Sequence, residues 1–253
     1  MIHPLDPRFR VVVIAATPNP QQCAYAAMHQ DYSEGFVAED YDLSAQVLPG
    51  GTLWEGEAGA ICVKRLLAGE RGHYGPLEHP QITFNVGWFP HSVMQQARTH
   101  RVGVSFDVQS MRYTGDRICK AANGELDLEE VFYLRKPDLY RDRNGHVYKY
   151  TEEHRAADLD LCRVAAKRYA ELIAQGFAEE HARGILPFDY RQHFVVSFTM
   201  RALMHFLDLR SKLDAQLEIR AMCDLIWPHF EAWAPEIAAW YQQHRRYKAR
   251  LAP

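Results

Sequence analysis

The distribution of apolar residues along the chain predicts three strands. A β-branched run at residues 9–15, bounded by prolines, is typical of a buried strand. Between residues 81 and 88 apolar and polar residues alternate, which predicts a half-buried strand whose polar side could face a ligand. Residues 190–198 are also expected to form a strand, although the same pattern is compatible with a helix.

Other apolar residues recur at helical spacing and predict helices. A short helix is expected at residues 21–31, and another at 53–71 with Gly72 as its C-terminal cap. A helix over 90–96 should begin at its proline. The longest regular pattern lies at residues 152–174 and predicts an amphipathic helix. One face of that helix carries Leu161, Cys162, Ala165, Tyr169 and Leu172.

Two segments lack such regularity. Residues 33–52 are rich in glycine and acidic residues and are expected to be irregular. The polar segment 114–151 is expected to form a β excursion within the same domain. Within it, residues 129–134 predict a strand and Asn144-Gly145 predicts a hairpin turn.

The C-terminal part of the chain is predicted to be helical. One helix is expected over residues 200–209. A last, long helix should be capped by Asp214, reach Tyr247 and be broken at Pro228 and Pro235. Because strands and helices do not alternate regularly, we expect an α+β fold in which helices flank a central, mostly antiparallel sheet.

Composition and charge narrow the class of protein. The chain has 253 residues, of which 47% are hydrophobic and 24% charged, and a single domain spanning residues 1–253 is expected. The net charge of −3 argues against a protein that binds nucleic acid or a membrane surface, so any cationic site must be local. The five cysteines are widely separated, which predicts reduced thiols. We see no apolar signal core and no apolar run long enough to span a membrane, so a cytoplasmic protein is expected.

Cationic side chains are concentrated in residues 96–113, which include Arg98, Arg101 and Arg112. Guanidinium groups bind phosphate oxygens in pairs and stack on aromatic rings, so this stretch predicts a site for a planar anion such as a nucleotide. The alternative is an exposed basic loop, which the interleaved apolar residues disfavour. We interpret Ser110 as a hydrogen-bond donor to the anion rather than a nucleophile, with a turn serine as the alternative.

A second cationic group lies downstream and contains Arg183, Arg201, His205 and Arg210. Arg201 and His205 are four residues apart and share one face of a helix. Arg210 follows Arg201 by nine residues, so a continuous helix would direct it to the opposite side. Either the helix ends before Arg210, or the two arginines serve different sites of an oligomer. For each arginine, a surface ion pair is the alternative.

A metal site at His73, Glu78, His79 and His91 is considered and rejected. Histidine and carboxylate are usual zinc ligands, but their spacing here does not match the helical motif H-E-x-x-H, and two prolines interrupt the segment. We therefore expect no metal. A structural role and a ligand-binding role remain equally open for these residues.

Four separate blocks of sequence resemble one family. The run R-T-H-R-V-G-V-S-F-D-V-Q-S-M-R-Y is similar to the signature of flavin-dependent thymidylate synthases, which reads R-H-R, then seven or eight residues, then Ser. H-Y-G-P-L-E-H, A-R-G-I-L-P and R-A-L-M-H-F-L-D-L-R resemble further blocks of that family in the same order. The chain departs from the signature at Thr99, which replaces the first arginine of R-H-R, and it uses the longer spacing from Arg101 to Ser110.

The resemblance implies a homotetramer with active sites at subunit interfaces, which converts dUMP to dTMP. FAD would be the cofactor, 5,10-methylenetetrahydrofolate the carbon donor and NADPH the reductant. Carried over to this chain, the residues that contact FAD would be Gly75, Thr99, His100, Arg101, Gln109, Thr199, Arg201 and His205. Those that bind substrates would be His73, Gln96, Ala97, Arg98, Thr99, Gln109, Ser110, Met111, Arg112, Arg183 and Arg210, with His73 near the flavin where folate and nicotinamide enter.

The chemistry of uracil methylation is consistent with this resemblance. C5 becomes nucleophilic either through a thiolate adduct at C6 or through stabilisation of negative charge on the ring. No cysteine lies within the arginine-containing blocks, so we assign the second role to Arg210 as the catalytic residue. Two alternatives stay open: a homologue that binds FAD and nucleotide without turnover, and an RNA-binding module, which the acidic charge disfavours.

Overall fold

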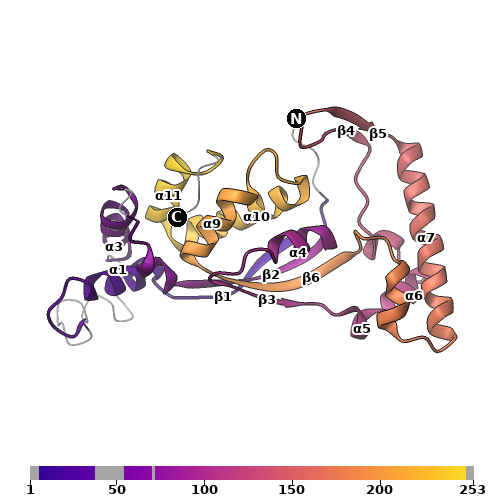
Figure 1. Cartoon of the computed structure of the whole chain (residues 1–253), viewed down its shortest axis with the longest axis horizontal. Helices are drawn as coiled ribbons and strands as arrows, with labels where there is room; N and C mark the ends of the chain where they lie inside the picture. Colours follow the sequence, from indigo (N-terminus) through magenta and orange to yellow (C-terminus); the bar gives the residue numbers. More distant parts are fainter. Residues whose placement is uncertain (1–5, 38–53, 70–71, 249–253) are drawn as a thin grey trace. The chain divides into compact units, whose positions relative to one another are not determined.

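The computed structural model describes residues 6–37, 54–69 and 72–248, and among these four strands form one sheet in the order β1-β2-β6-β3 (Figure 1). Two further strands, β4 and β5, pair antiparallel as a hairpin. The α+β class with a mostly antiparallel sheet is therefore confirmed. The strands are β1 (Arg10–Ala16), β2 (Gln81–Pro90), β3 (Val104–Val108), β4 (Asp138–Arg141), β5 (Val147–Tyr150) and β6 (Arg191–Thr199).

The chain separates into two compact units, which are described in turn. Unit 1 consists of Met1–Arg10, Asn85–Thr99 and Asp107–Val195, and unit 2 of Val11–Phe84, His100–Phe106 and Val196–Pro253. Their boundaries fall inside β1, β2, β3 and β6, so each unit contains its own part of these strands. That the whole chain acts as one domain stays a prediction.

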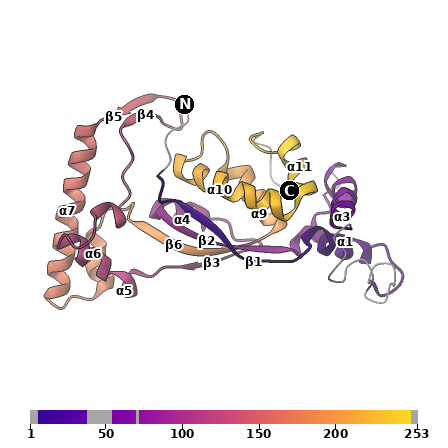
Figure 2. The same cartoon turned by 180° about the vertical axis from the view of Figure 1, so that it is seen from behind.

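The core of unit 2 is built from aromatic side chains between its part of the sheet and the C-terminal helices. The ring of Phe198 in β6 lies 6.3 Å from that of Phe84 in β2 and 5.1 Å from that of Phe206 in α9. Both views show α9 and α10 over this part of the sheet (Figures 1 and 2). The helices are α9 (Met200–Arg210), α10 (Leu217–Trp233) and α11 (Pro235–His244).

A buried ionic network fixes α11 on α9. Asp208 has a side chain that is only 1% exposed, and it accepts hydrogen bonds from the Tyr241 hydroxyl at 3.0 Å and from Arg245 Nη2 at 2.7 Å. Because a buried carboxylate without partners is costly, these contacts require α9 and the C-terminal helix to stay together. The network therefore stabilises the helix that carries most of the second cationic group.

The N-terminal helices of unit 2 are held by a buried glutamine. α1 (Pro20–Gln30) packs on α3 (Trp54–Cys62), which continues as a π-helical turn, Val63–Leu67. The carboxylate of Glu55 accepts the main-chain N–H groups of Gln21 and Gln22 at 2.7 and 2.9 Å, which satisfies donors in the first turn of α1. The Gln21 side chain in turn accepts the N–H of Ile237 at the start of α11.

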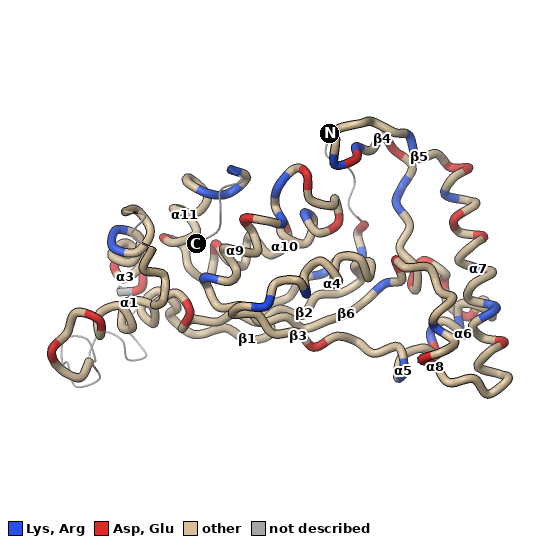
Figure 3. Tube along the Cα trace, viewed as in Figure 1, with Lys and Arg blue, Asp and Glu red and all other residues tan. Residues whose placement is uncertain are grey.

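Unit 1 is organised around α7 (Glu152–Ala174), which packs against α6 (Asp116–Ala122). Thr151 and His154 form a capping box at the N-terminus of α7, and Figure 3 shows acidic and basic residues along this helix. The predicted bounds of α7 are confirmed, but Leu161 does not belong to its buried face, since it is 62% exposed.

Fully buried Arg191 in β6 connects other segments of unit 1. It donates to Trp88 O at 2.7 Å and to Asp6 Oδ2 at 2.5 Å.

Most of the other predicted elements are confirmed with small shifts. Residues 191–199 form a strand and not a helix, and α1, α4 (His91–Ala97) and α9 lie where helices were expected. The hairpin at Asn144-Gly145 is confirmed as the turn between β4 and β5. The irregular segment expected at 33–52 falls mostly outside the described residues.

Several local predictions are wrong. The strand expected at residues 129–134 does not form: Leu128–Glu130 is a 3-10 turn, because the Asp127 carboxylate accepts the Glu129 N–H, and Phe132 makes an isolated β-bridge with Tyr190. The helix expected to reach Gly72 ends at Leu67. α10 begins after Gln216 and not at Asp214, and it continues through Pro228.

The segment 96–113 contains β3 and the start of a helical turn, α5 (Met111–Thr114), and neither element was predicted from the sequence. α6 was also missed within the segment 114–151, and α8 (Glu179–Ala182) follows α7. Within the part of the chain that the structure describes, no helix combines the length and apolar character needed to cross a membrane.

Candidate functional site

Helix α9 carries four of the predicted site residues. Thr199 is its N-cap, and the hydroxyl accepts the N–H of Ala202 at 3.2 Å. Arg201 and His205 follow within the helix, and Arg210 is its last residue. The helix therefore does not end before Arg210, which removes the first of the two explanations considered for the spacing of the arginines.

A cavity of about 260 Å³ lies at the N-terminal end of α9 within unit 2, and we refer to it as the α9 cavity. The Nδ1 atom of His205 is buried in this region and has no hydrogen-bond partner among the described residues. The N-terminus of a helix carries positive partial charge, so cavity and helix together suit an anionic group. The residues that line the cavity are Glu78, Val102, Gly103, Thr199, Arg201, Ala202 and His205.

Gly103 allows the close approach of its loop to the start of α9. Its φ is +67°, and a Cβ atom placed there would lie 2.6 Å from Thr199 Oγ1 and 3.0 Å from Ala202 Cβ. Its carbonyl accepts the Thr199 N–H at 2.9 Å. A side chain at this position would therefore occupy the wall of the cavity and press on the cap of the helix.

The guanidinium of Arg201 has two neighbours in unit 2. Its Nη1 atom donates to Glu78 Oε1 at 2.5 Å, and its Cζ lies 5.8 Å from the centre of the Tyr74 ring. The side chains of Arg201 and Glu78 are 36% and 45% exposed, so the ion pair is accessible to solvent. The sequence analysis left a structural and a ligand-binding role open for Glu78, but nothing in the sequence indicated that it pairs with an arginine more than a hundred residues away.

His100 and Arg210 are joined by a hydrogen bond. Arg210 Nε donates to His100 Nε2 at 2.9 Å, and His100 is only 7% exposed. Burial, with smaller contributions from Arg210 and His205, lowers the pKa of His100 to about 4. His100 is therefore neutral near pH 7, and because Nε2 is the acceptor, its proton lies on Nδ1. Burial also lowers the pKa of Arg210.

Cys223 lies close enough to Arg210 to interact with it electrostatically, which the separation of the two residues in sequence did not indicate. The thiol is 1% exposed, and burial raises its pKa to about 12. It therefore remains protonated and inaccessible at neutral pH. The expectation that no cysteine acts as nucleophile is compatible with this environment.

The predicted residues of unit 1 lie around the ends of α4 and the start of α5. Arg98 is the C-cap of α4 and is exposed, while Ala97 is buried. Ser110 is the N-cap of α5, and its hydroxyl accepts the Arg112 N–H at 3.4 Å. Ser110 thus has the local structural role weighed as the alternative, and its own proton remains available for donation. Gln96 and Gln109 are half-buried, and Met111 is buried.

Two further observations concern polar groups of unit 1. Arg112 Nε lies 3.4 Å from Glu180 Oε2, and the Arg183 side chain is exposed after α8. Gln109 Oε1 is buried without a partner among the described residues. Its main-chain atoms are fully used, since its N–H donates to His193 O and its carbonyl accepts from Gln192 Nε2.

Besides His100 and Arg210, three other predicted residues of unit 2 do not line the α9 cavity. Gly75 and Arg101 are exposed, and His73 Nε2 lies 2.7 Å from Asp31 Oδ2. Thr99, at the edge of unit 1, donates its hydroxyl to Gln96 O at 2.7 Å. Among the described residues there is no group of three or more histidine, cysteine, aspartate or glutamate side chains suited to a metal ion.

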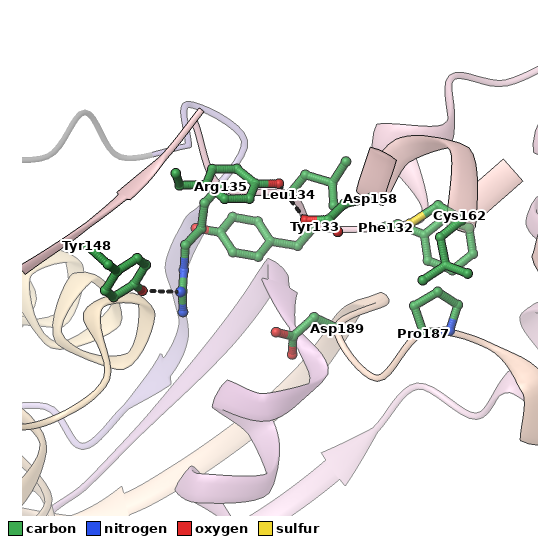
Figure 4. Close-up of a pocket in the computed structure, with 11 residues that line it drawn as sticks. Phe132, Tyr133, Leu134, Arg135, Tyr148, Asp158, Cys162, Pro187 and Asp189 are labelled. Carbon is green, nitrogen blue, oxygen red and sulfur yellow. Dashed lines mark hydrogen bonds between the residues drawn. The ribbon is translucent and has the colours of Figure 1, made fainter. Parts of the chain in front are cut away.

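A second cavity, of about 290 Å³, lies in unit 1 and contains none of the predicted site residues (Figure 4). Four of the eleven residues that line it are aromatic: Phe132, Tyr133, Tyr148 and Tyr150. Arg135 Nη1 donates to the Tyr148 hydroxyl at 3.1 Å, and the Tyr150 hydroxyl donates to Asp158 Oδ2 at 2.7 Å. The polar groups of this cavity are thus largely engaged with each other.

Known proteins are similar to this chain over most of its length. A family model described as "Thymidylate synthase complementing protein" matches residues 12–236. A flavin-dependent thymidylate synthase of Halobacterium salinarum is 34% identical over 96% of this chain and 100% of its own length. Another, of Haloarcula marismortui, is 33% identical over 96% of this chain and 99% of its length.

A solved structure shares the fold. The UMP/dUMP methylase PolB of Streptomyces cacaoi, bound with 5-Br UMP, superposes with a TM-score of 0.70 and covers 97% of this chain and 96% of its own. Its sequence is only 21% identical, so this likeness concerns the fold alone.

Proposed function

The chain belongs to the flavin-dependent thymidylate synthase family, and on this premise we propose that it methylates dUMP at C5 to form dTMP. FAD is the proposed cofactor, 5,10-methylenetetrahydrofolate the carbon donor and NADPH the reductant. The observation that carries the proposal is the α9 cavity, where a helix N-terminus, an arginine and a buried histidine nitrogen without a partner among the described residues meet.

The residues around the α9 cavity fit a phosphorylated cofactor. Arg201 and the N-terminus of α9 supply positive charge for phosphate, and His205 Nδ1 supplies a polar atom that has no partner among the described residues. Thr199 and His100 complete this part of the proposed FAD site, with Gly75, Thr99, Arg101 and Gln109 as further proposed contacts. FAD, when bound, supplies the redox chemistry of the reaction.

Arg210 has the surroundings that its proposed catalytic role needs. Neutral His100 accepts from Arg210 Nε, and this contact holds the guanidinium in place. Half-burial strengthens the interaction of the cation with an anionic ring, so Arg210 can favour negative charge on uracil and make C5 nucleophilic. The thiol of Cys223 is protonated and buried, so a thiolate adduct is not part of the proposal.

Exposed cations of unit 1 are proposed to bind the phosphate of dUMP. Arg98, Arg112 and Arg183 all present accessible side chains, and guanidinium groups pair with phosphate oxygens. Gln96, Ala97, Thr99, Gln109, Ser110 and Met111 are the remaining proposed contacts to dUMP. His73 is proposed to lie where folate and nicotinamide enter.

We further propose that the protein is a homotetramer with sites at its interfaces. Leu161 and Val164 on α7 are 62% and 65% exposed, and apolar side chains at such positions favour association. Light scattering coupled to size-exclusion chromatography tests this proposal, which a monomer at micromolar concentration would overturn.

The visible spectrum of the purified protein tests the function most directly. We expect bound flavin that is bleached by NADPH, and formation of dTMP from dUMP and methylenetetrahydrofolate. Arg210→Ala should retain flavin but lose methyl transfer. A colourless protein that gains no activity on addition of FAD would overturn the proposal, and a yellow protein without turnover would indicate a homologue that only binds its ligands.

A further inference from the structure

Glu78 is the acidic residue among those that line the α9 cavity. All other polar groups of this cavity suit an anion, yet the Glu78 carboxylate is bonded to Arg201, the cation that an anionic ligand would need. The Glu78–Arg201 contact therefore bears on how the cavity binds an anion, and not only on the stability of the fold.

The main chain that carries Glu78 is anchored to the beginning of α9. Glu78 ends the 3-10 turn Gly75–Glu78, whose Pro76 and Leu77 are buried. Two residues later, the carbonyl of Pro80 accepts the N–H of Met200 at 3.0 Å. The carboxylate is thus delivered to Arg201 by fixed backbone, while its side chain, at 45% exposure, can still change rotamer.

The two neighbours of Arg201 lie in different positions relative to the cavity. Glu78 lines the cavity together with Arg201, whereas Tyr74, whose ring centre is 5.8 Å from Arg201 Cζ, does not. A group that only orients the guanidinium need not line the cavity, and Tyr74 does not. Glu78 instead occupies the side from which a ligand would approach.

We propose that Glu78 is a displaceable counter-ion of Arg201, which neutralises the guanidinium in the empty site and yields it to the phosphate of the cofactor. This inference rests on the proposed function, because it takes the anion to be a phosphate of FAD. The carboxylate competes for Arg201 Nη1 and repels the phosphate, so it weakens binding and keeps it reversible.

Titration of flavin-free protein with FAD tests the competition. Glu78→Gln removes the charge at constant shape, and we expect it to tighten FAD binding about two- to fivefold, the range that an exposed ion pair covers. In an Arg201→Leu background the same substitution should lose most of this gain. Weaker binding by Glu78→Gln, or an equal gain in both backgrounds, would overturn the proposal.

Glu171→Gln is the matched control. Glu171 Oε2 pairs with Arg168 Nη1 at 3.0 Å on the exposed surface of α7, with comparable side-chain exposure, but in unit 1 and outside the cavity. We expect FAD affinity to be unchanged in this variant. A gain equal to that of Glu78→Gln would show that overall charge, and not competition for Arg201, is responsible, and would also overturn the proposal.

A second ligand tests the role of Glu78 independently of the proposed function. Inorganic pyrophosphate, which lacks the flavin, should raise the melting temperature of Glu78→Gln more than that of the wild type. If the wild type binds no FAD, the proposed function fails, and this comparison alone decides on Glu78. Equal stabilisation of both proteins by pyrophosphate, or none, would then overturn the counter-ion as well.

Discussion

Replacing Gly103 by alanine should destabilise the protein through two separable effects. The first is backbone strain, because φ at Gly103 is +67°, a left-handed conformation that costs a residue with a Cβ about 1–2 kcal/mol. The second is steric. The new Cβ would lie 2.6 Å from Thr199 Oγ1, so Thr199 must rotate and lose its cap on α9, which costs about 1 kcal/mol. Together we expect a loss of about 2–3 kcal/mol in the free energy of unfolding.

Gly124→Ala separates the two effects. Gly124 has φ +80°, but a Cβ there would meet no heavy atom within 4 Å, so this variant should show the backbone strain without the clash. Urea denaturation, monitored by circular dichroism at a fixed protein concentration, gives both values. The Gly103 variant should be less stable than the Gly124 variant by about 1 kcal/mol, the contribution of the lost cap.

A double substitution checks the assignment to Thr199. Thr199→Ala should cost about 1 kcal/mol in the wild type but much less in the Gly103→Ala background, because the cap is already lost there. Equal stability of the two glycine variants would refute the steric argument. Equal cost of Thr199→Ala in both backgrounds would show that Gly103 does not act through the cap.

Three further outcomes follow from the structure. Asp208→Asn should lower the free energy of unfolding by about 3–5 kcal/mol, because it removes the charged partner of the largely buried Arg245–Asp208 ion pair; a loss below about 1 kcal/mol in urea denaturation would contradict the role of this network. Since the pKa of His100 is lowered from 6.5 to about 4, the unfolded state binds more protons between these values and stability falls as the pH decreases. Between pH 7 and 4 the wild type should lose about 3 kcal/mol more than His100→Gln, and parallel pH profiles would exclude a neutral buried histidine. Gln21→Ala should expose the first turn of α1 to proteolysis near residue 20, because the amide that accepts the Ile237 N–H is lost; unchanged limited proteolysis would argue against this connection.

The local pattern of residues was sufficient for elements whose hydrophobic period is regular. The helix 152–174 was predicted with its bounds because its apolar residues recur at helical spacing over that range. The strands at β1, β2 and β6 were likewise visible in the sequence, because their apolar residues are continuous or alternate. Four spaced motifs were enough to indicate the family, to which the comparisons then assigned the chain.

Tertiary structure decided what depends on neighbours distant in sequence. The strand expected at residues 129–134 reduces to one β-bridge between Phe132 and distant Tyr190, whereas the local Asp127 cap favours a 3-10 turn at Leu128–Glu130. Leu161 was expected inside but lies on the exposed face of α7, because the helix is covered along a narrower stripe than its composition suggested.

The sequence also could not predict which charged and polar groups pair around helix α9. The pairing of Arg201 with Glu78 and the hydrogen bond from Arg210 to His100 join residues more than a hundred positions apart. The neutrality of His100 follows from burial, which is a property of the folded chain. Residue types and spacing thus determined which chemistry the chain can support, whereas the packing of α9 against distant loops determined which groups are paired, buried or available to a ligand.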